Sequence, residues 1–142
     1  MSGYLKPIPV PDAVSKIFWQ GCSKQELLLQ KCSNCGRFQF YPRIFCINCM
    51  SQNLEWVPSS GKGTVHTFTI VHQNVMPGFV KDVPYVYAIV ELAEGVHLTT
   101  NIVDCAPAEV YIGMPVSVAF ETIAPEINLP KFRPARNGNQ LK

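Results

Sequence analysis

Cys32-Ser-Asn-Cys35 and Cys46-Ile-Asn-Cys49 are two Cys-x-x-Cys pairs separated by ten residues. Each pair makes a tight turn that brings two sulfurs to one side of a metal ion, and two such turns complete a tetrahedral shell of four thiolates. A full shell leaves no position for a reacting water molecule. The spacing therefore predicts a structural zinc site in which the metal organises the chain and takes no part in chemistry.

Iron, two disulfides and a redox dithiol compete with zinc for these four residues. Iron accepts the same tetrahedral thiolates, so it stays open as an alternative. Disulfides are disfavoured because the chain starts Met-Ser-Gly-Tyr, without the features of a secretory signal, and a cytoplasmic location is expected. Two pairs this close also argue against a thioredoxin-like dithiol. The remaining cysteines, Cys22 and Cys105, are expected to lie in or near the core.

Composition indicates a protein that uses part of its surface for a partner. Of the 142 residues, 47% are hydrophobic and only 15% are charged, well below the roughly 25% of charged residues in average soluble proteins. A net charge of +2, spread along the chain, is too small to indicate nucleic-acid binding. No apolar run approaches the ~20 residues that cross a bilayer, so we expect no membrane partner.

The N-terminal part is predicted to contain an extended arm and one short helix. Prolines at positions 7, 9 and 11 favour an extended arm, which would lie either on another chain or back on its own fold. Asp12 is placed to cap a helix over residues 13–20, and Gly21 is placed to end it. An apolar run at 26–30 then predicts a strand leading into the first cysteine turn, and 37–45 predicts a hairpin arm with aromatic side chains over the cage.

Alternating and β-branched segments dominate the rest of the chain. A Ser- and Gly-rich break at 59–63 separates them from the cysteines. Five strands joined by short links suggest a small closed barrel of the OB type, with an open sandwich as the alternative. The predicted strands cover residues 64–72, 85–92, 96–103, 116–121 and 129–133.

These patterns divide the chain into four parts. They are an N-terminal arm and helix (1–25), a zinc ribbon (26–58), a five-stranded OB-fold domain (59–134) and a flexible C-terminal tail (135–142). The fold is thus predicted to be mainly β, with one N-terminal helix.

Several motifs in order resemble the DUF35 family. They are Phe18-Trp19-Gln20-Gly21, the run from Leu27 to Gly36, Tyr41-Pro42-Arg43-Ile44-Phe45-Cys46, and Gly61-Lys62-Gly63-Thr64-Val65. The resemblance covers residues 11–134 and implies an N-terminal helix, a rubredoxin-like zinc ribbon and an OB domain. One departure is Met50 after the second cysteine pair, where glycine would allow the tight turn more easily.

The resemblance also implies a function. Similar proteins accompany thiolase-fold enzymes that act on acyl-CoA thioesters, in thiolysis, condensation or retro-aldol steps, and are regarded as companion subunits without catalytic residues of their own. It implies that this chain stabilises such a partner and shapes its acyl-CoA site. The residues expected to contact the partner or the acyl-CoA are Phe18, Trp19, Phe132 and Arg133. For Arg133, a carboxylate or a CoA phosphate would be the partner, and a solvated side chain is the alternative.

Two other functions remain as alternatives. Single-stranded nucleic acid suits a zinc ribbon beside an OB barrel, with Phe68, Tyr85 and Tyr87 as a stacking platform, although the charge balance disfavours it. A stand-alone acyl-CoA carrier is the other. The three histidines are expected to be ordinary strand residues without a catalytic role, with His66 and His72 sharing one strand face.

Overall fold

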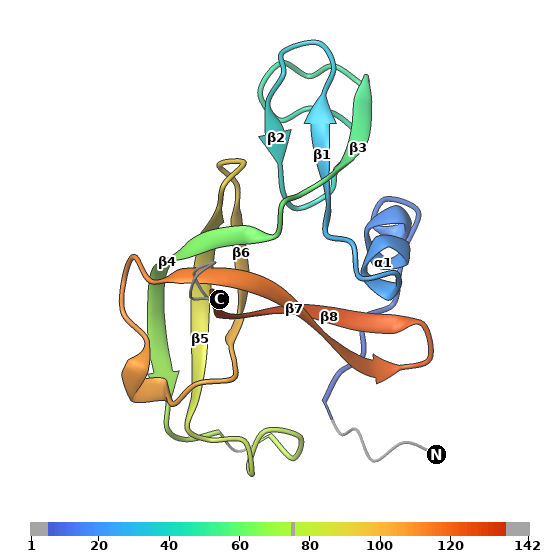
Figure 1. Cartoon of the computed structure of the whole chain (residues 1–142). Coiled ribbons are helices and arrows are strands. Elements are labelled where there is room, and N and C mark those ends of the chain that lie inside the picture. The colour runs from blue at the N-terminus through green and yellow to red at the C-terminus, as the bar shows by residue number, and fades with distance from the viewer. Residues whose placement is uncertain (1–5, 75, 136–142) are drawn as a thin grey trace.

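The computed structural model describes residues 6–74 and 76–135 and shows a small zinc-ribbon-like sheet above a β-barrel, with one helix beside them (Figure 1). The upper sheet has the strand order β2-β1-β3. The elements, in chain order, are α1 (Lys16–Ser23), β1 (Leu28–Cys32), β2 (Phe38–Gln39), β3 (Leu54–Pro58), β4 (Lys62–Val71), β5 (Tyr85–Leu92), β6 (His97–Ile102), the 3-10 helix η1 (Pro107–Glu109), β7 (Pro115–Ala124) and β8 (Ile127–Pro134).

Strands β4 to β8 form a closed barrel in the order β4-β5-β6-β8-β7. Antiparallel pairing of β4 with β7, for example Lys62 with Ser117, closes the ring. Strands β6 and β8 run parallel and meet at Ile102 and Phe132. The predicted OB-type barrel is confirmed, and the open sandwich is wrong because pairing between β4 and β7 leaves the sheet without free edges.

One apolar core joins the barrel to the helix and to the base of the ribbon. Alternation along the strands directs every second side chain inward, so Val65, Val90 and Phe132 are at most 1% exposed. Phe18 of α1 and Leu29 of β1 belong to the same cluster of buried residues. The helix and the ribbon therefore cannot shift relative to the barrel without opening shared core.

The helix differs from its prediction at both ends. The Asp12 carboxylate accepts hydrogen bonds from the N–H groups of Val14 and Ser15, so it stabilises a turn, and the helix begins only at Lys16. Gly21 does not end the helix, which continues to Ser23. A Cβ atom at Gly21 would lie 2.7 Å from the Leu28 side chain, so this glycine permits close packing of α1 against β1.

The ribbon contains a third strand that was not predicted. Strand β3 pairs with β1 along its whole length, from Leu54 opposite Cys32 to Pro58 opposite Leu28. Its side chains are half-buried or exposed, and none is fully buried. The sequence of this strand therefore lacks the clear alternation of apolar and polar residues that indicates a strand. Long-range pairing with β1 determines this strand more than its own residues do.

A single carboxylate fastens the link between ribbon and barrel. Glu94, in the β5–β6 turn, accepts hydrogen bonds from the Ser59 hydroxyl and the Ser60 N–H, both at 2.9 Å. The Ser59 N–H also donates to the Leu27 carbonyl at 2.7 Å. The serine-rich break is thus an ordered joint, because its polar groups find partners on both sides.

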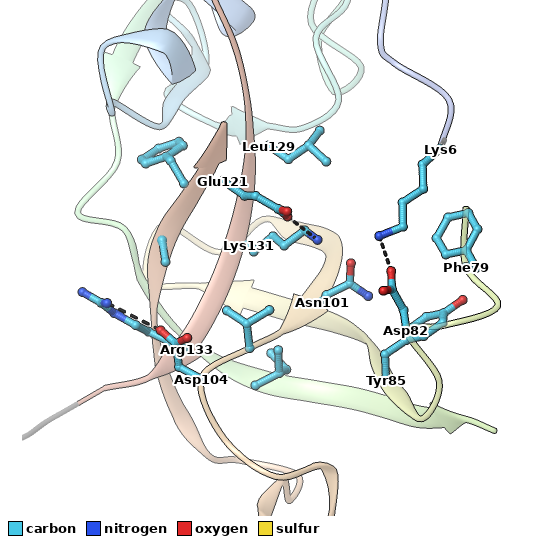
Figure 2. A pocket seen from close by; sticks show the side chains of 14 residues that line it. Lys6, Phe79, Asp82, Tyr85, Asn101, Asp104, Glu121, Leu129, Lys131 and Arg133 are labelled. Carbon is cyan, nitrogen blue, oxygen red and sulfur yellow. Dashed lines mark ion pairs between the residues drawn. The ribbon is translucent and has the colours of Figure 1, made fainter. Parts of the chain in front are cut away.

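The described part of the N-terminal arm returns to its own chain. The Lys6 ammonium forms an ion pair with Asp82 and lies 5.1 Å from the centre of the Phe79 ring (Figure 2). Val10 of the same arm is 87% exposed. The ends of the arm and of the predicted tail, residues 1–5 and 136–142, lie outside the described residues.

Among residues 6–74 and 76–135, no helix has the length and apolar character required to span a membrane.

Replacing Phe132 should test the shared core. Its ring is fully buried where β6 and β8 meet, so Phe132→Ala should lower the free energy of unfolding by about 3–5 kcal/mol. Chemical denaturation followed by circular dichroism measures this. Tyr111→Ala, at a side chain that is 56% exposed, is the matched control and should cost less than about 1 kcal/mol. Equal losses in the two variants would contradict the assignment of the core.

Candidate metal centre and adjoining cavities

Each Cys-x-x-Cys pair forms a turn in which backbone N–H groups point at a sulfur. The N–H groups of Asn34 and Cys35 donate to the Cys32 sulfur at 3.3 and 3.4 Å. The second turn repeats this arrangement, with the N–H groups of Asn48 and Cys49 donating to the Cys46 sulfur at the same two distances. Donors aimed at sulfur favour its thiolate form, which is the form that binds metal.

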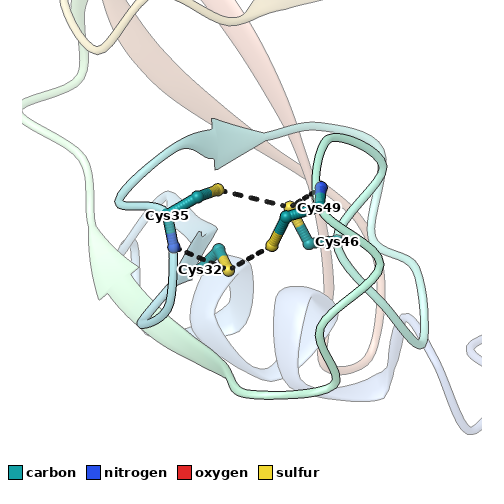
Figure 3. Close-up of side chains that lie close together, drawn as sticks. All are labelled: Cys32, Cys35, Cys46 and Cys49. Carbon is teal, nitrogen blue, oxygen red and sulfur yellow. Dashed lines mark hydrogen bonds between the residues drawn. The ribbon is translucent and has the colours of Figure 1, made fainter.

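The four cysteine sulfurs converge on one point. Cys32 and Cys49 Sγ atoms lie 3.6 Å apart, as do those of Cys35 and Cys46 (Figure 3). All four Sγ atoms are within 4.8 Å of one another. A tetrahedron with Zn–S distances of about 2.3 Å has edges of about 3.8 Å, so the residues present fit a single tetrahedral ion.

Hydrogen bonds change the acidity of three of these thiols. The backbone N–H of Arg37 and the side chain of Asn48 lower the pKa of Cys35 to about 6. The Asn34 side chain lowers the pKa of Cys49. For Cys32, the Cys35 N–H acts to lower the pKa, but burial and the adjacent thiols raise it overall. The hydrogen bonds at Cys35 and Cys49 thus favour the thiolate, which is the form that binds metal.

Two buried glutamines hold the segment that leads to the second cysteine turn. The Gln30 side chain donates to the Arg43 carbonyl and accepts from the Arg43 N–H, both at 2.8 Å. Gln39 donates to Gln30 at 2.7 Å and accepts from the Ile47 N–H at 3.0 Å. Sequence reasoning missed both residues, because a glutamine in a strand carries no signal of burial.

Met50 occupies the position where the family resemblance favours glycine. Its φ of 68° is in the left-handed region, like the 81° of Gly36 after the first pair. Both residues donate their N–H to the carbonyl of the first cysteine in their turn. The second turn therefore keeps the geometry of the first at a backbone cost of roughly 1–2 kcal/mol.

The other two cysteines lie away from the four-sulfur cluster. Cys22 is fully buried, and burial raises the pKa of its thiol to about 12. Burial also raises the pKa of the half-buried Cys105. Neither thiol is activated, so the prediction that they are structural is supported by their surroundings.

An apolar cavity of about 270 Å³, called here the helix cavity, lies where the helix, the ribbon and the barrel meet. Trp19 of α1, Phe40 and Tyr41 of the ribbon, and Leu129 of β8 line it. The rings of Phe18 and Trp19 pack edge to face at 5.0 Å, and this contact fixes the wall formed by the helix.

A larger cavity of about 660 Å³, called here the charged cavity, lies beside the helix cavity and is lined by β6, β7 and β8 among other segments (Figure 2). Its cations are paired: Lys131 with Glu121 at 2.6 Å and Arg133 with Asp104 at 3.6 Å. The two cavities share three lining residues, namely Asn101, Leu129 and Lys131. They therefore adjoin, one apolar and one charged.

The four predicted contact residues have different positions. Trp19 is half-buried and lines the helix cavity, and Arg133 is exposed beside the charged cavity. Phe18 also lines the helix cavity, but it is only 4% exposed and mainly supports Trp19. The prediction for Phe132 is corrected, because its ring is fully buried in the barrel core and is not available to a partner in this fold.

The three aromatic residues predicted to form a platform for bases do not all face one side of the barrel sheet. Phe68 pairs with Ala88 on the inward side of the barrel and packs against the core. Tyr87 pairs with Thr69 on the outward side and is 52% exposed. Because their rings point to opposite sides of the sheet, Phe68 and Tyr87 cannot stack on the same strand of nucleic acid.

The chain matches two known protein domains in sequence order. Residues 19–55 match the rubredoxin-like zinc ribbon domain of ChsH2, and residues 56–121 match the C-terminal OB-fold domain of ChsH2. A solved structure described as the Ltp2-ChsH2(DUF35) aldolase has a chain that superimposes with a TM-score of 0.80 and 34% identity, over 89% of this chain and 98% of that one. The chain belongs to the DUF35 family.

The relatives of this chain include a scaffold protein and subunits of two different enzymes. A scaffold protein from Methanocaldococcus jannaschii is 46% identical over 66% of each chain. A probable enoyl-CoA hydratase alpha subunit from Thermomonospora curvata is 35% identical over 92% of this chain but only 40% of its own length. The benzoylsuccinyl-CoA thiolase subunit BbsA from Geobacter metallireducens is 32% identical over 48% of this chain and 44% of its own. The chain thus spans about two fifths of the hydratase subunit.

Removing one sulfur should test the metal centre. Cys46→Ser should lose tightly held zinc and the dispersed amide signals of the ribbon, because metal binding and ribbon folding are coupled. Metal analysis after dialysis against a mild chelator, together with amide NMR spectra, measures both effects. Cys105→Ser, outside the cluster, should retain both. A Cys46→Ser protein that keeps its zinc and its ribbon signals would show that the cage is misassigned.

Proposed function

We propose that this DUF35 protein is a non-catalytic, zinc-stabilised subunit of an enzyme complex that acts on acyl-CoA thioesters, with a thiolase-fold protein as its partner. One observation carries the proposal: this chain is similar to 98% of the matched chain in the structure described as the Ltp2-ChsH2(DUF35) aldolase. Relatives called scaffold protein and thiolase subunit support it further. Within the described residues, no hydroxyl or thiol is hydrogen-bonded to a histidine as a nucleophile and base would be.

In this proposal the four cysteines hold Zn²⁺, and the ion supplies structure alone. Four thiolates fill its shell, so no coordination position remains for substrate or water. The ribbon then presents a fixed surface. Four large apolar side chains on it are more than half exposed: Tyr41, Ile44, Ile47 and Met50. We name them the ribbon apolar residues and propose that the thiolase-fold partner covers them, since several large apolar side chains exposed on one short segment, residues 41–50, favour contact with another protein.

The adjoining cavities provide a place for the acyl-CoA substrate at the edge of the complex. The apolar helix cavity suits an acyl group, and its wall includes Trp19 and Phe40. The charged cavity carries Arg133, whose partner Asp104 is exposed and 3.6 Å away, a weak pairing that a phosphate could replace. In this arrangement the partner supplies the reacting groups, and this chain positions the substrate.

Partner binding should depend on the ribbon apolar residues. Ile47→Glu should lower recovery of a co-expressed thiolase-fold protein from the same genome neighbourhood by about tenfold or more, because it buries a charge in the interface. Co-purification and analytical ultracentrifugation measure this effect. Ile112→Glu, at a similarly exposed isoleucine on the barrel side of the chain (67% against 58%), is the control and should leave recovery unchanged. Failure of every neighbouring thiolase-fold protein to co-purify with the wild type would end the proposal.

Substrate binding in the complex should depend on Arg133. Arg133→Ala should raise KM for the acyl-CoA about tenfold while kcat changes little, since a charge-assisted bond to phosphate contributes to binding and not to the reacting centre. Steady-state kinetics of the complex checks this. Arg37→Ala, on the exposed part of the ribbon, serves as the control of equal charge change. Turnover by the isolated chain, or an unchanged KM, would contradict the assigned role.

A further inference from the structure

Three potential metal ligands meet on the outer surface of the barrel, apart from the cysteines. They are His66 of β4, Glu91 of β5 and His97 of β6, and all three are exposed. One ligand atom from each lies within 4.8 Å of the other two. The imidazole rings of His66 and His97 are stacked, with centres 4.4 Å apart.

Strand register and one bulge produce this cluster. Glu91 lies directly opposite His97 in the β5–β6 pair and opposite Thr64 in the β4–β5 pair. Between Val65 and Thr67 the register of β4 slips, so His66 is the extra residue of a β-bulge. A bulge re-aims the side chain of its extra residue, and here it turns His66 toward the space above Glu91.

Glu91 lacks the charged partner that three other carboxylates of the molecule have. Asp82, Asp104 and Glu121 each pair with a lysine or an arginine. Glu91, within the described residues, has no ion pair or side-chain hydrogen bond, and its carboxylate lies near two imidazole rings instead. A cation held between the three would satisfy the carboxylate and both imidazoles at once.

We propose that His66, Glu91 and His97 form a second metal site, which binds a divalent transition-metal ion such as Zn²⁺. Two imidazoles and one carboxylate are a ligand set that zinc accepts, whereas calcium and magnesium prefer oxygen alone. Ligand atoms around zinc are about 3.3 Å apart, and rotation of these exposed side chains closes the remaining gap. Three protein ligands leave a position for water or for a donor from another chain.

This site does not depend on the proposed function of the ribbon, and metal counting separates the two. Full-length protein is dialysed against Zn²⁺ at a buffered free concentration in the micromolar range, and bound zinc is measured per chain. The wild type should hold two equivalents, one in the ribbon and one on the barrel. His66→Ala, His97→Ala and Glu91→Gln should each hold only the ribbon equivalent, with an unchanged melting temperature in the absence of the second ion.

His72→Ala is the matched control, because His72 is an exposed histidine just beyond the end of β4 and outside the cluster. It should keep both equivalents. NMR adds a direct readout: Zn²⁺ should shift the imidazole signals of His66 and His97 and leave those of His72 in place. One equivalent in the wild type, or a second equivalent retained by both His66→Ala and His97→Ala, would overturn the proposal.

Discussion

Convergence of four sulfur atoms is the constraint on which the ribbon depends. Its three strands are short, and a sheet of this size buries too little apolar surface to fold alone. The cysteine turns bring the two ends of the 36–45 segment together, and only then can Gln30 bond the backbone of Arg43 and Gln39 bond that of Ile47. Buried amide groups without those partners would destabilise the ribbon. The glutamine network therefore depends on the metal site, and the exposed isoleucines keep their positions only when both are formed.

The helix has a different task, because it connects the ribbon to the barrel core. Phe18 is buried in the core while Trp19, its neighbour, forms a cavity wall. The Asn128 side chain of β8 donates to the Cys22 carbonyl at 2.8 Å and ties the end of the helix to the barrel. The cavity therefore has walls from three parts of the chain, and its shape is a property of their assembly. This suits the proposed role of a subunit that contributes a surface to an enzyme complex.

Local features of the sequence were predicted well and long-range ones were not. Two cysteine pairs specify their turns through neighbouring residues alone, and alternation reveals the barrel strands, including the closing strand β8. The prediction that Gly21 ends the helix is wrong. Its small size makes room for the Leu28 side chain, and the helical pattern of the sequence does not show this contact. Phe132 is apolar like an interface residue, and only barrel closure shows that it is internal. His66 was expected on one face with His72, but a bulge and the pairing of three strands place it beside His97.

Glu94 has a consequence for the joint between ribbon and barrel. Two adjacent serines donate to this one side chain in a turn, outside the apolar core. Substitution of Glu94 would remove these polar bonds and leave the core that Leu29 shares with the barrel to hold the ribbon in place. The joint would then rest mainly on apolar packing, which resists separation of the two parts but fixes their mutual rotation less strictly than directed hydrogen bonds do.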